Sequence, residues 1–242
     1  MYKIIIISFI LICSGCNNNR NHKVLNKELN ILSPKDKIWA HRVNSLNDIK
    51  DRVDDFHGIE VDIFYNKTDD NFEVKHDIDS KGINLENFLD SVLKVKEVLF
   101  WFDYKNLNEQ PNAGISKLSA ILSERKLENT SFVESYYASD LERFDEKMAT
   151  SYWVSAIQVP TQKVKRDKLY KEKYKHIQSL NVSMLSASYE MFDFLTDYFP
   201  LYKCNYWMSG SLSKEKIVIL NKMALSSNVN IILIDGNQNL LK

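Results

Sequence analysis

The stretch GIEVDIFY (residues 58–65) predicts a strand whose two faces differ in polarity. Successive side chains of a strand point to opposite faces, so Glu60 and Asp62 project together. The other face carries the apolar residues Ile59, Val61 and Ile63. Unpaired carboxylates are costly to bury beside an apolar core. We therefore expect the carboxylate face of this strand to meet a metal ion or a cluster of cations.

Strand and helix patterns alternate from about residue 37 to the end of the chain. Strands are expected over residues 38–43, 58–65, 98–105, 131–136, 152–159, 182–188, 202–208 and 229–234, with a further hairpin strand over 72–75. The helices expected between them include residues 46–53, 85–95, 115–125 and 217–225. Strands that alternate with helices imply a parallel sheet with right-handed crossovers. Eight such strands favour an α/β fold of the closed (βα)8 TIM-barrel type over an open sheet.

Chemically active side chains fall at or just after the ends of the first three predicted barrel strands and of the hairpin strand. They are His41, Arg42, Glu60, Asp62, His76, Asp103 and Lys105. In a TIM barrel, strand ends and the loops after them form the site. Carboxylates suit Mg²⁺ or Ca²⁺, imidazoles move protons near neutral pH, and Arg and Lys hold phosphate oxyanions. The set therefore predicts metal-assisted attack on a phosphodiester.

Two more side chains are candidate pocket residues with alternatives left open. Glu134 falls late in the fourth predicted strand, where it could reach the pocket or pair with Arg42 or Lys105. Trp207 falls late in the seventh, where it could wall a substrate or pack in the core. For Asp103 and Lys105 a purely structural ion pair is the alternative to a role in the site.

Composition excludes several other classes of protein. Lys plus Arg and Asp plus Glu both number 32 among 242 residues, so no strong field points to a nucleic-acid partner. The six glycines are too scattered for a P-loop or a dinucleotide-binding fingerprint. The chain contains no G-x-S-x-G elbow and no C-x-x-C pair, which are the signatures of serine hydrolases and zinc ribbons. We expect a monomer.

The N-terminal residues have the pattern of an export signal. Lys3 precedes a short apolar run over residues 4–12, and Ser14, Gly15 and Cys16 follow it. The run is too short to span a bilayer. The segment resembles a bacterial lipoprotein signal, which implies lipidation of Cys16; an ordinary cleaved signal or an uncleaved anchor is the alternative.

We therefore expect three parts in the chain: a signal peptide (1–15), a flexible tether (16–35) and one barrel domain (36–242). The resemblance to lipoproteins implies a location in the bacterial cell envelope, with the protein held to a membrane by its lipid anchor.

Six segments of the chain resemble the glycerophosphodiester phosphodiesterase family, within the phospholipase C-like phosphodiesterase barrels. They are IWAHRVNS (38–45), GIEVDIFYNKTDDNFEVKHD (58–77), LFWFDYKN (99–106), SFVESYYASDLERF (131–144), NYWMSG (205–210) and NIILIDG (230–236). The resemblance implies three groups of residues: His41 and His76 as catalytic histidines; Glu60, Asp62 and Asp103 as ligands of a divalent metal; Arg42 and Lys105 as the phosphate-binding pair.

Two departures separate the chain from the usual family pattern. Val43 and Asn44 follow His-Arg where the family usually has glycine, and Asp103 stands where the family commonly has glutamate. Both arrangements are more similar to the sphingomyelinase D-like branch, whose members form a cyclic phosphate.

The function implied is an exported hydrolase of lipid metabolism that cleaves a glycerophosphodiester or a lipid-headgroup phosphodiester. The attacking group is water or a hydroxyl of the substrate itself. A catalytically inactive barrel that binds a phosphorylated ligand or glycan at the cell surface is the first alternative. A glycosidase that uses Glu60 or Glu134 with Asp103 is the second.

Overall fold

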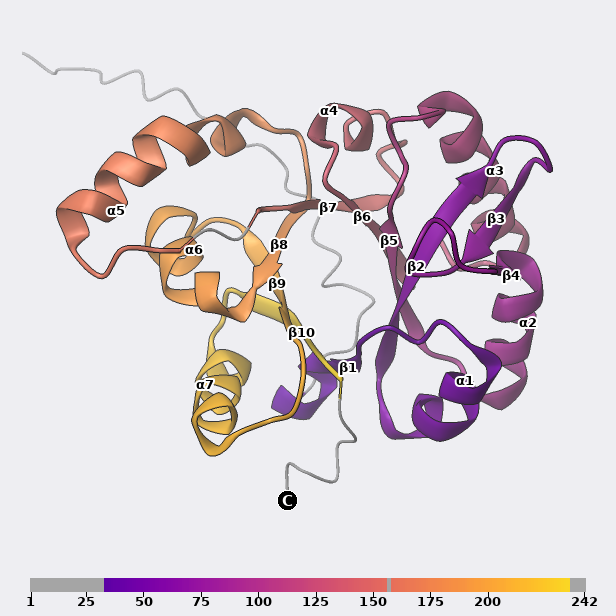
Figure 1. The fold of residues 1–242 in the computed structure, drawn as a ribbon, viewed down its shortest axis with the longest axis horizontal. Helices are drawn as coiled ribbons and strands as arrows, with labels where there is room; N and C mark the ends of the chain where they lie inside the picture. The colour runs from indigo at the N-terminus through magenta and orange to yellow at the C-terminus, as the bar shows by residue number, and fades with distance from the viewer. Residues whose placement is uncertain (1–32, 156–157, 236–242) are drawn as a thin grey trace, which may run out of the picture.

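Eight parallel strands close into a barrel in the computed structural model, which describes residues 33–155 and 158–235 (Figure 1). The closed order is β1 (Ile38–Ala40), β10 (Val229–Ile234), β9 (Lys203–Met208), β8 (Met184–Ser188), β7 (Ala149–Trp153), β6 (Ser131–Ser135), β5 (Leu99–Tyr104) and β2 (Gly58–Asn66). The pairing of Ala40 with Ile59 joins β1 to β2 and completes the ring. The TIM barrel predicted from the strand count is therefore confirmed.

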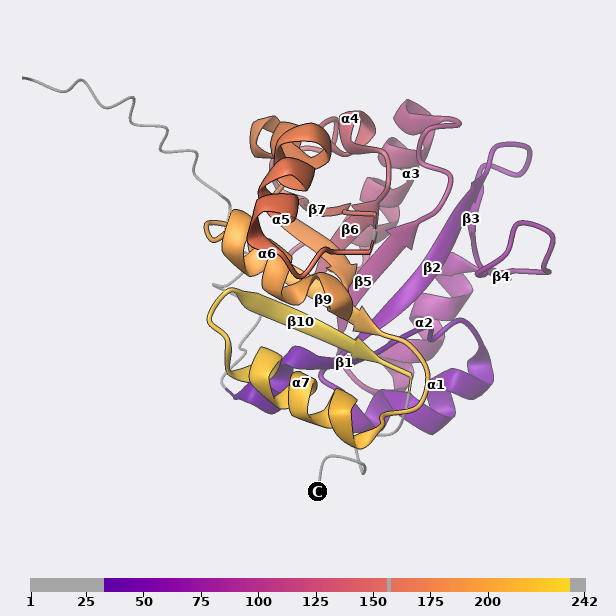
Figure 2. The same ribbon diagram turned by 60° about the vertical axis from the view of Figure 1, so that its left-hand side comes forward.

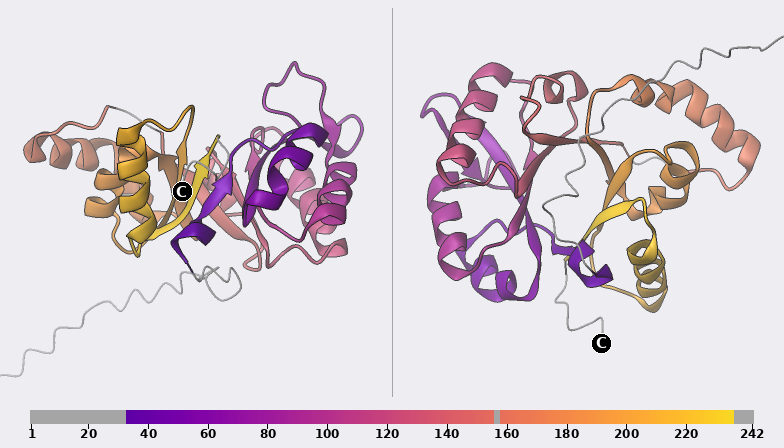
Figure 3. Two further views of the ribbon diagram at one scale, coloured as in Figure 1. Left: turned by 90° about the horizontal axis from the view of Figure 1, so that it is seen from below. Right: turned by 180° about the vertical axis from the view of Figure 1, so that it is seen from behind.

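Helices lie between the strands and form the outer layer of the barrel (Figure 3). They are α1 (Leu46–Arg52), α2 (Leu85–Val95), α3 (Pro111–Glu124), α4 (Ala138–Leu141), α5 (Lys163–Leu169), α6 (Phe192–Tyr198) and α7 (Lys214–Leu225). Shorter turns are η2 (Pro34–Lys37), η3 (Val53–Asp55), η4 (Tyr170–Tyr174), η5 (Lys175–Ser179) and η6 (Tyr189–Met191). In the described part of the chain no helix is both long and apolar enough to cross a membrane.

Local sequence explains where the helices begin and which face they bury. The Ser45 side chain accepts a hydrogen bond from the Asp48 N–H and caps α1, and Asn84 caps α2 in the same way. Helix α2 buries apolar side chains at helical spacing: Leu85, Phe88, Leu89 and Val92. Its bounds are those expected from the sequence.

The extra hairpin follows β2. Strand β3 (Asn71–Val74) pairs antiparallel with the end of β2, and the two-residue β4 (Ile83–Asn84) adds to β3 (Figure 2). The backbone N–H of Lys75 still donates to the carbonyl of Asp62 at 3.1 Å. The hairpin therefore carries the chain back beside the carboxylate strand just before His76.

Strand β7 differs most from its prediction, and β1, expected to reach residue 43, ends at Ala40. A strand was expected over residues 152–159, but β7 covers Ala149–Trp153. The expectation followed the apolar residues Val154 and Val159, whereas the barrel pairs Thr150 and Ser151, small polar residues that are buried between β6 and β8. Tertiary pairing outweighs the local apolar signal here.

Large side chains fill the bottom of the barrel interior. Trp39, Trp101 and Phe132 pack in one cluster with Leu99, Ala149, Met184, Ile231 and Leu233. A Cβ atom at Gly58 would overlap the Trp39 indole, so glycine is required where β2 begins. The charged side chains of the interior lie above this cluster, at the C-terminal ends of the strands.

The predicted signal peptide, Cys16 and most of the predicted tether lie outside the described residues. The last tether residues, 33–35, already belong to the turn η2 and its cap.

Candidate active site

One pocket opens at the C-terminal ends of the barrel strands and holds about 100 Å³ of free space. Its lining comprises His41, Arg42, Glu60, Asp62, His76, Trp101, Asp103, Lys105, Glu134, Trp153, Trp207 and Leu233. All seven residues singled out at the predicted strand ends are among them, as are both candidate pocket residues. The structure therefore brings together side chains that are distant along the chain.

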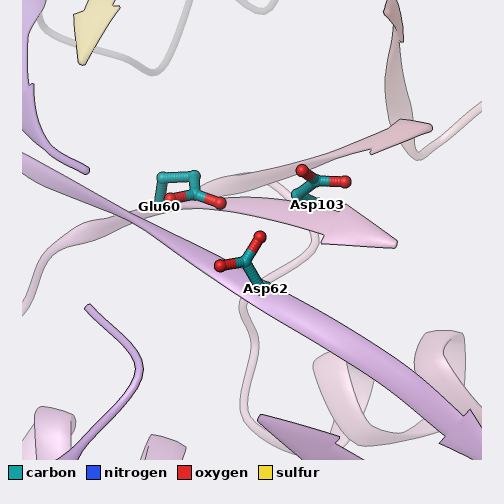
Figure 4. Close-up of side chains that lie close together, drawn as sticks. All are labelled: Glu60, Asp62 and Asp103. Carbon is teal, nitrogen blue, oxygen red and sulfur yellow. The ribbon is translucent and has the colours of Figure 1, made fainter. Parts of the chain in front are cut away.

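Three carboxylates form the buried acidic centre of the pocket. Asp62 on β2 and Asp103 on β5 are register partners, and Glu60 precedes Asp62 on the same face (Figure 4). One oxygen from each lies within 4.8 Å of the others. Burial, and then the neighbouring carboxylates, raise the pKa of Glu60 well above its usual range; burial also raises the pKa of Asp103. These three residues can hold a divalent cation.

Lys105 is the fixed cation of this centre. Its Nζ lies 2.5 Å from Oδ1 of Asp62 and also contacts Oδ2 of Asp103. Burial acts to lower the pKa of Lys105, but the surrounding carboxylates outweigh it and raise that pKa. The ion pair between Asp103 and Lys105 that the sequence left open therefore exists, and it lies inside the pocket.

Asn44 holds the Asp62 side chain in place from the loop after β1. Its Nδ2 donates to Oδ2 of Asp62 at 2.5 Å, and its Oδ1 accepts from the Asp62 backbone N–H at 3.0 Å. From the sequence, Asn44 was noted as a departure from glycine and as a similarity to the sphingomyelinase D-like branch, and it received no role in the site. The signal that pointed to it was its place two residues after Arg42 of the His-Arg pair.

Arg42 approaches Glu60 through its backbone. Its N–H donates to Oε2 of Glu60 at 2.6 Å, and its φ of 55° lies in the left-handed region. A non-glycine residue there is strained by roughly 1–2 kcal/mol. Such strain is characteristic of functional sites, where the surrounding structure maintains it. The guanidinium remains exposed at the pocket edge.

His41 is oriented by a carboxylate at the far end of the chain. Its Nδ1 lies 2.5 Å from Oδ1 of Asp235, and Oδ2 of Asp235 accepts from the Gly210 N–H. Burial acts to raise the pKa of Asp235, but these bonds outweigh it and hold that pKa below its usual value. Arg52 donates to the carbonyls of His41 and Ile234, which fixes the two strand ends against each other. Asp235 was missed as a site residue.

His76 lies at the exposed rim of the same pocket, after β3. Its Nδ1 lies 2.8 Å from Oδ1 of Asp77. Both pocket histidines thus have Nδ1 engaged by a carboxylate, which leaves Nε2 as the nitrogen available to a ligand.

Aromatic side chains form one wall of the pocket mouth. The Trp153 and Trp207 rings meet edge to face with centroids 5.4 Å apart, and Tyr136 packs edge to face on Trp153 at 6.0 Å. Trp207 was a candidate for this wall, and the structure places it there. The Nζ of Lys105 lies 5.8 Å from the Trp153 centroid, so the wall borders the acidic centre.

Glu134 is buried in the pocket lining, on β6 beside Asp103. Among the described residues it forms no ion pair with Arg42 or Lys105, and its Oε2 has no hydrogen-bond partner. Burial, and then the charge of Asp103, raise the pKa of Glu134 well above its usual range. The chemistry predicted from the sequence leaves this side chain without a role.

The acidic centre has the properties required of a divalent metal site. Three buried oxygen donors converge, and burial together with the neighbouring carboxylates raises the pKa of Glu60 and of Asp103. Lys105 supplies only one charge to three carboxylates. The residues therefore fit a hard divalent cation.

The fold and pocket define a TIM barrel with an acidic, histidine-flanked site at its C-terminal mouth. No protein-family model matches the sequence, and comparison with curated proteins finds no match by sequence. Solved structures do share the fold. A glycerophosphodiester phosphodiesterase from Parabacteroides distasonis ATCC 8503 matches with a TM-score of 0.64 and 16% identity, over 86% of this chain and 96% of that chain.

A second glycerophosphodiester phosphodiesterase, from Thermotoga maritima, matches with a TM-score of 0.58 and 13% identity, over 85% of this chain and 96% of that chain. The N-(5'-phosphoribosyl)anthranilate isomerase from Pyrococcus furiosus also matches, with a TM-score of 0.51 and 10% identity, over 82% and 88%. At these sequence identities the structural similarity establishes the fold only, and function has to be inferred from the residues of the site.

Proposed function

We propose that this protein is a metal-dependent phosphodiesterase of the glycerophosphodiester phosphodiesterase type. Its substrate is a glycerophosphodiester or a lipid-headgroup phosphodiester. The observation that carries the proposal is the meeting of His41 and His76, each with Nδ1 on a carboxylate, in one pocket with three carboxylates and two cations. The shared fold with the phosphodiesterases above supports it.

Glu60, Asp62 and Asp103 would hold the metal, which would supply positive charge to neutralise the charge that grows on the phosphoryl oxygens. Arg42 and Lys105 add fixed positive charge at the same centre. Mg²⁺ and Ca²⁺ both prefer carboxylate oxygens, so turnover with each added ion must identify which of them the protein uses.

The histidines divide the proton transfers. Nδ1 of His41 donates to Asp235, so Nε2 is free to take the proton of the attacking oxygen. His76 gives a proton to the leaving alcohol as its bond to phosphorus breaks. Each transfer contributes about 10²–10⁴-fold in rate. The attacking oxygen belongs either to water or to a hydroxyl group of the substrate. Attack by a substrate hydroxyl yields a cyclic phosphate, as in the sphingomyelinase D-like branch. The sequence around Asn44 and Asp103 resembles that branch.

The test is a panel of phosphodiesters assayed with and without added divalent metal, with products identified by phosphorus NMR. We expect metal-dependent release of alcohol from glycerophosphocholine, glycerophosphoethanolamine or a lysolipid. His41→Ala and His76→Ala should abolish turnover with the fold intact, and His176→Ala, at an exposed histidine of η5, is the matched control. Wild-type rates in either pocket variant would refute the two-histidine scheme. A glycosidase would ignore the panel and need no metal.

A second candidate function is a catalytically inactive barrel that binds a phosphorylated ligand or glycan. The ion pairs of Lys105 with Asp62 and Asp103 favour it, because they neutralise part of the acidic centre without a metal. Ligand-induced chemical-shift changes without turnover of any diester in the panel would identify this function.

We also propose that the protein is exported and anchored through a lipidated Cys16, on the pattern of residues 1–16. Labelled palmitate should be incorporated into the wild type and not into Cys16→Ala. Cys13→Ala is the matched control. Equal labelling of the wild type and Cys16→Ala would contradict the proposal.

A further inference from the structure

Helix α5 and the turns η4 and η5 that continue it carry a concentration of positive charge. Residues 163–175 contain seven lysines and arginines and two acidic residues, a net charge of +5, whereas the whole chain is neutral. Among the described residues, only one of the exposed lysines of this segment forms an ion pair: Lys168, with Glu172 at 3.7 Å. The exposed lysines, called the lysine face below, are Lys163, Lys165, Lys168, Lys171, Lys173 and Lys175.

The opposite face of the segment is packed against α6. The Tyr170 ring stacks on the Tyr198 ring with centroids 4.9 Å apart, and Nη2 of Arg166 lies 3.7 Å from Oδ2 of Asp197. The hydroxyl of Tyr198 also donates to Asp167. Helical periodicity therefore turns the lysine face outward, and Figures 1 and 3 show α5 at the edge of the molecule.

The residue types of the lysine face indicate an anionic lipid surface as its partner. Lysine is a compact, hydrated point charge that suits a diffuse negative surface, whereas the planar fork of arginine suits fitted contacts such as those to nucleic acid. All the exposed cations of the segment are lysines, and Arg166 pairs with α6 instead. Val164 lies between two of the lysines and is 80% exposed, so an apolar side chain is available to enter the headgroup region.

The segment is attached beside the aromatic wall of the pocket mouth. The hydroxyl of Tyr174, on η4, donates to the carbonyl of Ser155 at 3.0 Å. The hydroxyl of Ser155 donates in turn to the hydroxyl oxygen of Tyr136 at 3.1 Å, and Tyr136 packs on Trp153. The lysine face therefore belongs to the side of the barrel that carries this wall.

We propose that the lysine face binds the surface of a membrane that contains anionic lipid, and that it holds the pocket mouth beside lipid-headgroup substrates. This inference goes beyond the proposed phosphodiesterase function, because the face binds a bilayer whether or not the pocket cleaves a diester. None of the six lysines lines the pocket. The attraction extends over about 10 Å at 0.1 M ionic strength, so added salt weakens it.

The test measures binding of the full chain to vesicles of phosphatidylcholine, alone or mixed with phosphatidylglycerol. All proteins carry Cys16→Ala, so that no acyl chain contributes. This parent should bind the mixed vesicles more tightly, and high salt should abolish the difference. Each lysine near an anionic surface contributes about fivefold, so Lys165→Gln with Lys171→Gln should weaken that binding by about 25-fold. The matched control is Lys50→Gln with Lys94→Gln, at exposed positions of α1 and α2 across the barrel (Figure 1), and it should bind like the parent.

Equal binding of the parent to both kinds of vesicle would overturn the proposal, as would equal binding of the two double variants to the mixed vesicles. Binding of the parent to duplex DNA and not to mixed vesicles would assign the face to nucleic acid and refute the proposal. Turnover of soluble glycerophosphocholine should be the same in the parent and in Lys165→Gln with Lys171→Gln, and a loss confined to the variant would contradict a role in membrane binding alone. Absence of turnover in both proteins would refute the phosphodiesterase proposal and leave the vesicle test valid.

Discussion

Nδ1 of His41 lies 2.5 Å from Oδ1 of Asp235, and this contact joins the ends of β1 and β10 where the barrel closes. The carboxylate fixes which ring nitrogen carries the proton and which way the imidazole faces. The N–H of Gly210 donates to Asp235 and holds the carboxylate. Arg52 donates to the carbonyls of His41 and Ile234 and holds the two strand ends. The orientation of His41 is thus built into the scaffold.

Asp235→Asn should lower turnover by about 10²-fold or more, because an amide no longer selects the tautomer that leaves Nε2 free. Steady-state kinetics with a competent diester measures the effect. Asp193→Asn, at an exposed carboxylate paired with Lys222, is the matched control. If Asp235→Asn and Asp193→Asn had equal rates, the His41–Asp235 pair would have no part in catalysis.

Asn44→Ala should weaken divalent-metal affinity by about 10–100-fold, the range found when a residue that orients a metal ligand is removed. The reason is the loss of both hydrogen bonds between Asn44 and Asp62. Isothermal titration of the metal-free protein with Mg²⁺ or Ca²⁺ measures the affinity. Asn181→Ala, at an exposed position, should bind the metal like the wild type. An unchanged metal affinity in Asn44→Ala would show that Asn44 does not support the metal site.

Arg42→Gly and Arg42→Ala both remove the guanidinium, so both should weaken phosphate binding. They should differ in stability, because the φ of 55° at this position is free for glycine and strained for alanine. We expect Arg42→Gly to be more stable than Arg42→Ala by about 1 kcal/mol. Urea unfolding measures the difference, and greater stability of the alanine variant would show that the backbone strain is not released.

The sequence predicted the parts of the site that depend on strand periodicity. Glu60 and Asp62 face the interior together because side chains alternate along a strand, and the barrel rule placed Asp103 beside them. Asp235 was quoted within NIILIDG but received no role, because its proximity to His41 depends on closure of the barrel across 194 residues. Asn44 lies in a loop whose path follows the unusual φ of Arg42, which no local pattern encodes.

The predicted fold was right in the number of barrel strands; the two-residue strand β4 was not expected, and the other errors lie in strand boundaries. Strand β7 was displaced because its buried residues Thr150 and Ser151 are polar, and apolar content was the signal used. Because apolar content was used to find the strands, the buried polar residues of the barrel interior were not predicted; Asn205 and Asn230, which pair with each other, are examples.

The metal-free protein should lose stability as the pH rises. The pKa values of Glu60, Asp103 and Glu134 are raised in the folded state, mainly by burial. The unfolded chain releases these protons near the ordinary pKa values of 4.5 for glutamate and 3.8 for aspartate, whereas the folded chain keeps them to higher pH. The stabilisation is therefore complete below those ordinary values and is lost as the pH climbs through the raised values.

Urea unfolding in chelator, measured from acid to neutral pH, tests this expectation. Saturating divalent metal should reduce the loss of stability with rising pH, because the metal binds the ionised carboxylates of the folded state. Glu134→Gln should reduce the slope, since it removes one of the raised groups. Stability that is constant or increases over this pH range in chelator would contradict it.

Glu60, Asp62 and Asp103 converge closely enough to bind a divalent cation, and we propose that this cation is required to cleave a phosphodiester in this pocket. Phosphorus NMR of glycerophosphodiester turnover in chelator, followed by addition of Mg²⁺ or Ca²⁺, tests it most directly. We predict no product in chelator, restored turnover on addition of metal, and no restoration at the same metal concentration in Asp62→Asn. Turnover that continues in chelator, or a metal response that is unchanged in Asp62→Asn, would contradict the claim.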